Sequence, residues 1–187
     1  MRRFVSAAAA VSIFVILAGL PTGCSGSKEK AVPELPKRIC WNVFASSDVS
    51  PVLPVGDKAD VYHRPFVLVD DLDSVTCTLA IDGAPGFLAY ATLQGFEDQI
   101  DWTSMDKAKP QSINVGKKGI IWDSGAAAYF ICEPSRGPNS PGKYIDLRIT
   151  AGSAPDKAKL PSVLPPLMKQ FVAFAQRELK CGASSGD

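Results

Sequence analysis

The spacing of the cysteines constrains this chain more than any other feature of its sequence. Four of the five, Cys40, Cys77, Cys132 and Cys181, lie 37, 55 and 49 residues apart. A zinc site needs clustered ligands such as Cys-x2-Cys with histidine nearby, and His63 is the only histidine. The spacing therefore argues against a bound metal and predicts two disulfide bonds, provided that the chain reaches an oxidising compartment.

The first 23 residues have the parts of a secretory signal peptide. Arginines at positions 2 and 3 give a positive start, and an uncharged, mostly apolar run follows over residues 4–20. This run of 17 residues is at the short limit for a membrane-spanning helix, and Pro21 and Gly23 then break the helical pattern. We expect residues 1–23 to direct export and to be cleaved, rather than to remain as a transmembrane anchor.

Residues 20–24, Leu-Pro-Thr-Gly-Cys, resemble the lipobox of bacterial lipoproteins. In that family the cysteine receives a diacylglyceryl group and becomes the new N-terminus. The family usually has Leu three residues before the cysteine, where this chain has Pro21. The resemblance implies lipid attachment at Cys24, with fatty acyl chains such as palmitate holding the protein to the extracytoplasmic face of the cell membrane. Two chains suit stable attachment, because each buried CH₂ contributes about 0.8 kcal/mol and one chain holds only marginally.

The stretch after Cys24 has the composition of a linker. Residues 25–38, SGSKEKAVPELPKR, are small, charged and interrupted by proline. We expect residues 24–38 to be a flexible tether and residues 39–187 to be a single disulfide-stabilised domain. Without the leader the chain has 18 basic and 19 acidic residues, which argues against nucleic acid as a partner and against polybasic membrane attachment.

With Cys24 lipidated, the four remaining cysteines allow three pairings, and the sequence alone does not choose among them. We favour Cys40–Cys77 and Cys132–Cys181, because neighbours in the sequence close the smaller loops. Each such bond would stabilise the fold by about 4 kcal/mol through the entropy of the unfolded chain.

Alternating apolar and polar residues predict several strands. In residues 74–82, Val75, Cys77, Leu79 and Ile81 share one face. A turn at 83–86 should join this strand to one at 87–94, and a longer turn is expected at 134–142. Further strands are expected at 113–115, 119–123, 126–132 and 143–150, the last with Ile145, Leu147 and Ile149 inward and Asp146, Arg148 and Thr150 outward.

The C-terminal segment predicts an amphipathic helix, because apolar residues recur every three or four positions from Leu164 to Leu179. Pro165 and Pro166 should lie in its first turn, and Gly182 should follow its end. Ser46 or Ser47 should cap a short N-terminal helix; residues 56–64 should form a loop, and residues 96–110 a short helix or ordered loop. The expected fold is α+β, with an antiparallel, meander-like sheet packed against the C-terminal helix.

This arrangement resembles a broad group of small actinobacterial cell-envelope lipoproteins of unknown function. The shared features are the Leu-Pro-Thr-Gly-Cys start, Cys40 just after the tether, Cys77 in an early strand, and a terminal helix that ends in Cys181. The resemblance implies location and fold, and it brings no catalytic residues to this chain.

Known catalytic and binding motifs fail on their chemistry. Residues 137–143 have the spacing of a phosphate-binding loop, but Tyr144 stands where Ser or Thr is needed. The Ser-x-x-Lys at 104–107 lacks the companion Lys-Thr-Gly, and His63 lacks a nucleophile elbow. The other candidates have structural interpretations. We expect Asp70, Asp71 and Asp73 to be solvated turn residues, and Trp102, Trp122 and Tyr129 to be core residues.

These observations favour a non-enzymatic binding or interaction module at the cell surface, without a cofactor. Its partner would be an envelope protein, cell-wall material or a small ligand. The alternative is an exported hydrolase that uses carboxylates such as Asp98 and Asp101, which would require a pocket with two suitably spaced carboxyl groups, one with a raised pKa. A purely structural protein would instead have a convex surface without a pocket.

Overall fold

The computed structural model describes residues 31–181; the leader, Cys24 and Gly182 lie outside the described residues. The strands are β1 (Arg38–Ile39), β2 (Phe44–Ala45), β3 (Ala59–His63), β4 (Ser74–Ile81), β5 (Ala84–Gln94), β6 (Gln111–Ile113), β7 (Lys118–Trp122), β8 (Gly125–Glu133) and β9 (Lys143–Thr150). The α-helices are α1 (Ser46–Val49) and α2 (Leu160–Glu178). Short 3₁₀-helices are η1 (Ser50–Val52), η2 (Glu97–Gln99), η3 (Thr103–Ala108) and η4 (Lys157–Lys159).

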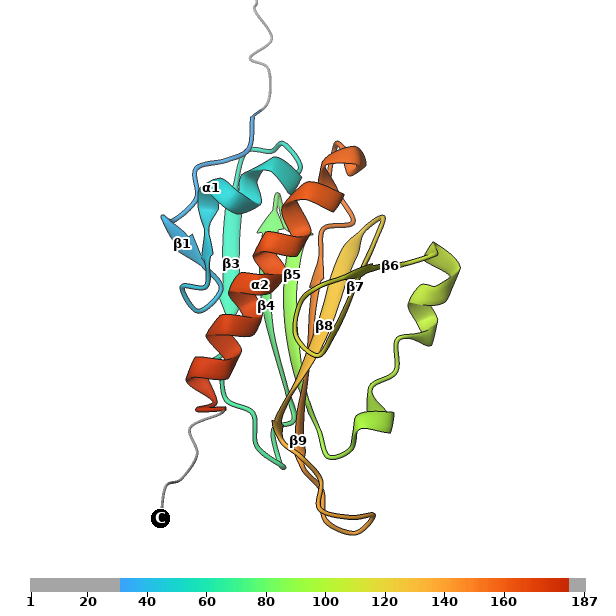
Figure 1. The fold of residues 1–187 in the computed structure, drawn as a ribbon. Helices are drawn as coiled ribbons and strands as arrows, with labels where there is room; N and C mark the ends of the chain where they lie inside the picture. Colours follow the sequence, from blue (N-terminus) through green and yellow to red (C-terminus); the bar gives the residue numbers. More distant parts are fainter. Residues whose placement is uncertain (1–30, 182–187) are drawn as a thin grey trace, which may run out of the picture.

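Seven strands form one antiparallel sheet in the order β3-β4-β5-β9-β8-β7-β6. The chain builds a first meander from β3 to β5, crosses to the far edge, and returns through β6 to β9 until β9 pairs with β5 (Figure 1). With α2 and the short α1, this arrangement confirms the predicted α+β fold.

Helix α2 lies diagonally across one face of the sheet (Figure 1). It buries Leu164, Leu167 and Phe171 completely or almost completely. Opposite it, β8 presents Ala126 and Ala128, whose small side chains let the helix approach the sheet closely. Burial of each large apolar side chain contributes about 1.5–3 kcal/mol, so this interface is the main hydrophobic core.

The period-two pattern of β4 is confirmed, since Val75, Cys77, Leu79 and Ile81 are all buried. The turn after it is shorter than predicted, because β5 begins at Ala84. Asp82 and Gly83 have φ of 50° and 81° and form the whole connection. An Asp-Gly pair with two positive φ values suits a two-residue hairpin turn, whose twist matches that of the strands.

Helix α2 begins at Leu160, so the prediction that Pro165 and Pro166 lie in its first turn was wrong. The two prolines leave the carbonyls of residues 161 and 162 without their usual amide donors, and both of these residues are exposed to water. Leu160 is fully buried. The gain from burying its side chain explains why the helix extends past the prolines.

Two N-terminal predictions also need correction. Residues 56–64 were expected to form a loop, but they contain the edge strand β3, which pairs with β4 from Ala59 to His63. A strand with one neighbour and an exposed outer side has little apolar alternation to reveal it. The predicted short helix is present as α1, but its N-cap is Ala45, while the Ser46 hydroxyl donates to the carbonyl of Pro36.

The end of the expected tether lies against the domain. Val32 and Leu35 pack against the main core, and the amide of Gly56 donates to the carbonyl of Ala31 at 3.0 Å. Residues 31–38 are therefore in contact with the folded domain.

Candidate functional site

The structure pairs Cys40 with Cys77 and Cys132 with Cys181, as favoured from the sequence. Their Cα atoms lie 5.4 and 4.7 Å apart, within the range that a disulfide spans. The first bond ties the β1–β2 hairpin to β4, and the second ties the end of α2 to β8. Both bonds fasten elements of the helix-covered face to the sheet.

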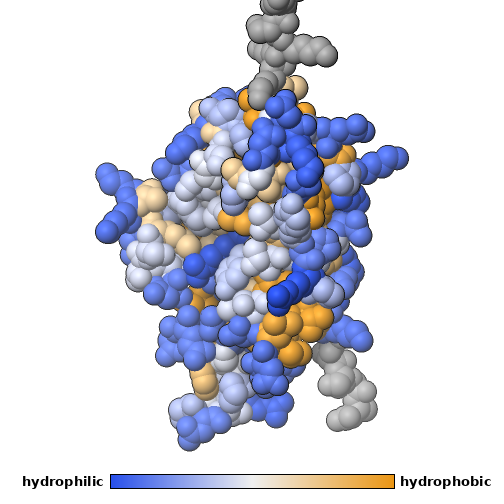
Figure 2. All heavy atoms as spheres, turned by 180° about the vertical axis from the view of Figure 1, so that it is seen from behind, coloured by the Kyte–Doolittle hydropathy of each residue, from blue (hydrophilic) through white to orange (hydrophobic). Residues whose placement is uncertain are grey.

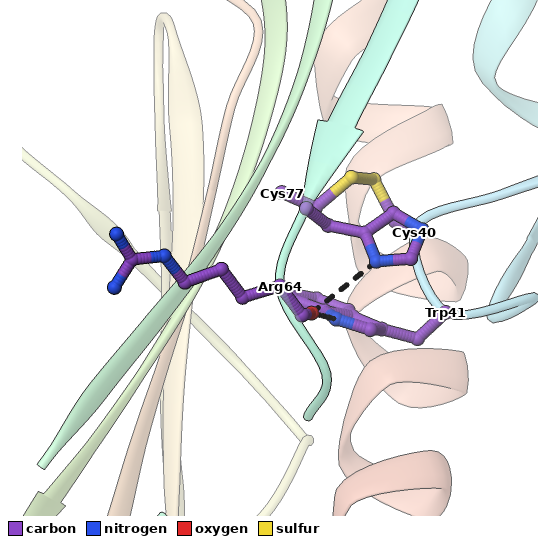
Figure 3. The surroundings of a disulfide bond; sticks show 5 residues. Cys40, Trp41, Arg64 and Cys77 are labelled. Carbon is purple, nitrogen blue, oxygen red and sulfur yellow. Dashed lines mark hydrogen bonds between the residues drawn. A yellow bond between two sulfur atoms is a disulfide. The ribbon is translucent and has the colours of Figure 1, made fainter. Parts of the chain in front are cut away.

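The tip of the β1–β2 hairpin is strained. Cys40, Trp41 and Asn42 have φ of 49°, 56° and 62°, and a left-handed conformation costs a residue with a side chain about 1–2 kcal/mol. The Arg38 guanidinium holds the tip by donating to the carbonyls of Asn42 and Val43 at 2.7 and 2.8 Å. The Trp41 indole donates to the carbonyl of Arg64 at 2.6 Å (Figure 3).

This strained tip places an aromatic ring against the helix. The Trp41 ring stacks on Phe171 and Phe174 with centroids 5.9 and 6.3 Å apart, and it meets Phe66 edge-on at 5.1 Å. Such pairs contribute about 0.5–1.5 kcal/mol each beyond the area they bury. The Cys40–Cys77 region therefore has a structural role: it holds the β1–β2 hairpin against the sheet and α2.

The other face of the sheet has a different cover. Over β7 to β9 it is covered by the segment that contains η2 and η3, and here Trp102, Ile120, Ala127 and Tyr129 form a second, small apolar cluster. The view of this face in Figure 2 is dominated by hydrophilic residues. The expectation that Trp102 and Tyr129 are core residues is confirmed, and Trp122 packs against the same cluster.

Asp146, on this face of the sheet, differs from the prediction in its burial. It points away from α2, as predicted, but it is 1% exposed rather than solvated. The Trp102 indole donates to it at 3.1 Å, and the Arg148 guanidinium donates at 2.7 and 3.1 Å. Arg148 also donates to the carbonyl of Asp101 at 3.1 Å. The buried carboxylate thus joins the sheet to the segment that covers it.

A cleft of about 380 Å³ opens between this segment and strands β7 and β8. Three carboxylates, two aromatic rings and one ammonium group are among its lining residues, which are Glu97, Ile100, Asp101, Trp102, Thr103, Asp106, Lys118 and Tyr129. The Lys118 ammonium lies 5.4 Å from the centre of the Trp102 ring. The lining of the cleft thus has more acidic than basic side chains.

Glu97 and Tyr129 are hydrogen-bonded to each other at the wall of the cleft. The Lys117 ammonium donates to both Glu97 oxygens at 2.7 Å, and the Tyr129 hydroxyl also donates to this carboxylate. The hydrogen bonds from Lys117 and Tyr129 lower the pKa of Glu97. Burial, together with the bond to Glu97, raises the pKa of Tyr129 to about 12. At neutral pH Glu97 is therefore ionised and Tyr129 keeps its proton.

The structure separates the two carboxylates proposed for hydrolysis. Asp101 lines the cleft, whereas Asp98 lies outside its lining. Hydrogen bonds from the Thr103 hydroxyl and amide, at 2.7 and 2.8 Å, lower the pKa of Asp101. A general acid would need a raised pKa, and the shifts of both Asp101 and Glu97 are in the opposite direction. The charge of Glu97 is already paired with Lys117, so the ionised Asp101 is the better suited of the two to attract a cation.

The remaining candidates lie away from the cleft, apart from the 104–107 motif, which is part of η3. His63 is exposed, and its Nδ1 lies 3.2 Å from the carbonyl of Arg64. Asp70 and Asp71 form the turn between the bridged residues Val69 and Leu72. The sequence had singled out Asp101, Trp102 and Tyr129, but not Glu97, Asp106 or Lys118 as a group. The acidic composition of residues 97–106 was the one available signal.

Comparison with known proteins gave no match to a family model, to a curated protein or to a solved structure. Among residues 31–181, no helix is long and apolar enough to cross a membrane.

Proposed function

We propose that the protein is an exported lipoprotein, anchored through Cys24, whose domain acts as a non-enzymatic binding module at the cell surface. The leader, the resemblance of residues 20–24 to a lipobox and the linker composition that follows support the anchor. Two disulfides in the domain support an oxidising location.

The ligand site of this module is the cleft beside η2 and η3. The observation that carries this proposal is the gathering of three carboxylates, Glu97, Asp101 and Asp106, around the rings of Trp102 and Tyr129. Carboxylates and the faces of aromatic rings favour a cationic group, and the Lys118 ammonium adds a hydrogen-bond donor. We assign to it a small amine-bearing ligand, of the kind found in the peptide part of cell-wall material.

Asp106 and Asp98 provide a matched pair of variants for this ligand. Soluble amine-bearing cell-wall peptides are titrated calorimetrically into the wild type, Asp106→Asn and Asp98→Asn. Because a partly exposed ion pair contributes up to about 1 kcal/mol, Asp106→Asn should weaken binding about fivefold, while Asp98→Asn should leave it unchanged. Equal losses in both variants, or no saturable binding by the wild type, would refute the cleft as the ligand site.

The anchor has a separate test. The intact mass of the protein from the membrane fraction should correspond to a chain that starts at Cys24, has a diacylglyceryl group and has no free thiol. Cys24→Ser should release the domain from the membrane. An uncleaved chain, or a wild-type protein found wholly in the soluble fraction, would contradict the anchor while leaving the cleft proposal open.

A further inference from the structure

Strand β3 leaves one side of the main sheet open. Within residues 31–181, β4 is the only strand that pairs with β3, along five residue pairs. The opposite edge is β6, which has three residues. An edge strand presents a row of backbone donors and acceptors that another strand can join. The five-residue edge of β3 is therefore the longer of the two edges of this sheet.

Exposed apolar side chains concentrate around the same edge. Every large apolar residue classed as exposed in the described chain lies between residues 55 and 72, within β3 or on its two flanks: Val55, Tyr62, Val67, Val69 and Leu72. Tyr62, in the strand itself, is the most exposed of them at 59%. Figure 2 shows an apolar patch at the lower right of the face without α2. Such clustering is typical of interaction surfaces.

The charges of this edge are arranged about Tyr62. Asp60 and Tyr62 are two residues apart and point to the face without α2, and Arg64 lines a depression on that face with Tyr62, Thr76 and Thr78. The Arg64 side chain extends away from the Cys40–Cys77 bond (Figure 3). Among the described residues Arg64 has no ion pair, and Asp60 pairs with the exposed Lys58 at 2.9 Å.

We propose that β3 pairs antiparallel with β3 of a second copy of this chain, with Tyr62 opposite Tyr62. In this register Asp60 of each copy lies opposite Arg64 of the other, so that two ion pairs flank the central pair of aromatic rings. Opposite charges and aromatic pairs directly across two strands stabilise the pairing by about 0.2–1 kcal/mol each. The flank before β3 in one copy also meets the apolar flank after β3 in the other.

The charges also select the register. An arrangement centred on Val61 would place Lys58 opposite Arg64, and like charges directly across two strands are destabilising. The register centred on Tyr62 removes that repulsion. The dimer uses neither the cleft nor the lipid anchor, and it is independent of the function proposed above.

Cysteine substitution tests the register directly. The full chain is purified in detergent, treated with a mild oxidant and assayed for covalent dimer by non-reducing electrophoresis and intact mass. Tyr62→Cys should cross-link, because opposite Cα atoms in an antiparallel pair lie about 4.5–5.5 Å apart, within disulfide reach. Asp60→Cys should not, because the two copies of residue 60 would be separated by about 13 Å. The wild type is the control for native cysteines.

Charge reversal gives a second measurement that needs no new cysteine. Asp60→Arg and Arg64→Asp should each weaken association measured by sedimentation about tenfold, and the double variant should restore it. The proposal is overturned if Tyr62→Cys does not cross-link, or if Thr76→Cys on β4 cross-links equally well, which would indicate random collision. It is also overturned if the double variant associates no better than the single ones, because Asp60 and Arg64 would then not pair across the two copies.

Discussion

The two faces of the sheet are built in different ways. The face under α2 is closed by a long helix, fully buried side chains such as Phe171 and Leu164, and two disulfides. The other face is covered only in part, by two short 3₁₀-helices that a buried Asp146 ties to the sheet. The first cover packs apolar side chains against the sheet, whereas the second leaves a cleft with ionised carboxylates in its wall.

This difference separates stability from recognition. Apolar contacts and cross-links on the helix face do not depend on how the cleft segment is placed, so the cleft can use charged groups that a core would exclude. The covering segment needs only enough contacts to keep those groups in position. Substitutions on the two faces should therefore have different consequences for folding.

The largest effect is expected from the helix face. Phe171→Ala removes a fully buried ring that contacts Trp41, Phe44 and Phe66 and should lower the free energy of unfolding by about 3–5 kcal/mol. Leu88→Ala, on the uncovered face of β5, should cost about 1 kcal/mol. Urea denaturation measures both. Similar losses would show that the two faces contribute equally to stability.

Removal of the Cys40–Cys77 bond should have the next largest effect. The double substitution Cys40→Ala, Cys77→Ala should lower the free energy of unfolding by about 3 kcal/mol, because a closed loop of this length contributes about 4 and the strained hairpin tip can then relax. The matching removal of Cys132–Cys181, where Lys180 alone has a positive φ, should cost more. Urea denaturation of the two variants compares their free energies of unfolding. A larger loss on removal of Cys40–Cys77 than on removal of Cys132–Cys181 would refute the hairpin as a source of strain.

Asp146 tests the attachment of the other face. Asp146→Ala removes the acceptor of the Trp102 indole and the carboxylate partner of Arg148, and should cost about 2 kcal/mol. Asp146→Asn keeps an acceptor and should cost less. Tryptophan fluorescence should shift to longer wavelength in the alanine variant, because the covering segment loosens. An unchanged spectrum with full stability would mean that Asp146 does not hold this segment.

The sequence predicted the helix face better than the other face, for a physical reason. Regular alternation in β4 and a helical repeat in α2 are local consequences of burial, so each segment shows them by itself. Asp146 is buried because Trp102, 44 residues earlier, lies over it, and no local pattern reports such a cover. For the same reason, the sequence indicated some of the residues of the cleft but not that they lie together.

Other mispredictions have equally specific causes. β3 was taken for a loop because Tyr62 and His63 are exposed and its one neighbour leaves little alternation. The start of α2 was placed too late because proline disfavours a helix locally, whereas the buried Leu160 favours it through tertiary contacts. Propensity and patterning describe a segment alone, and these two segments are decided by their neighbours.

A smaller effect should appear at alkaline pH. The pKa of Tyr129 is raised from 10.0 to about 12 in the folded protein, so the folded state keeps a proton that the unfolded state loses. Between these values the contribution of Tyr129 to stability falls as the pH rises. Tyr129→Phe should lose less stability over this interval than the wild type, with Tyr62→Phe as the exposed control. If the stability of the wild type and of both variants depended on pH in the same way, the raised pKa of Tyr129 would be contradicted.

Native-state hydrogen exchange tests the contrast between the faces most directly. Backbone amides of β4, β5, β8 and β9 should exchange only through global unfolding, while hydrogen-bonded amides at residues 99–109 should exchange through local opening at a clearly lower free energy. This result would show that the cover of the cleft moves independently of a stable sheet and helix. Exchange of residues 99–109 at the global free energy would show one uniform structure and contradict the separation of stability from recognition.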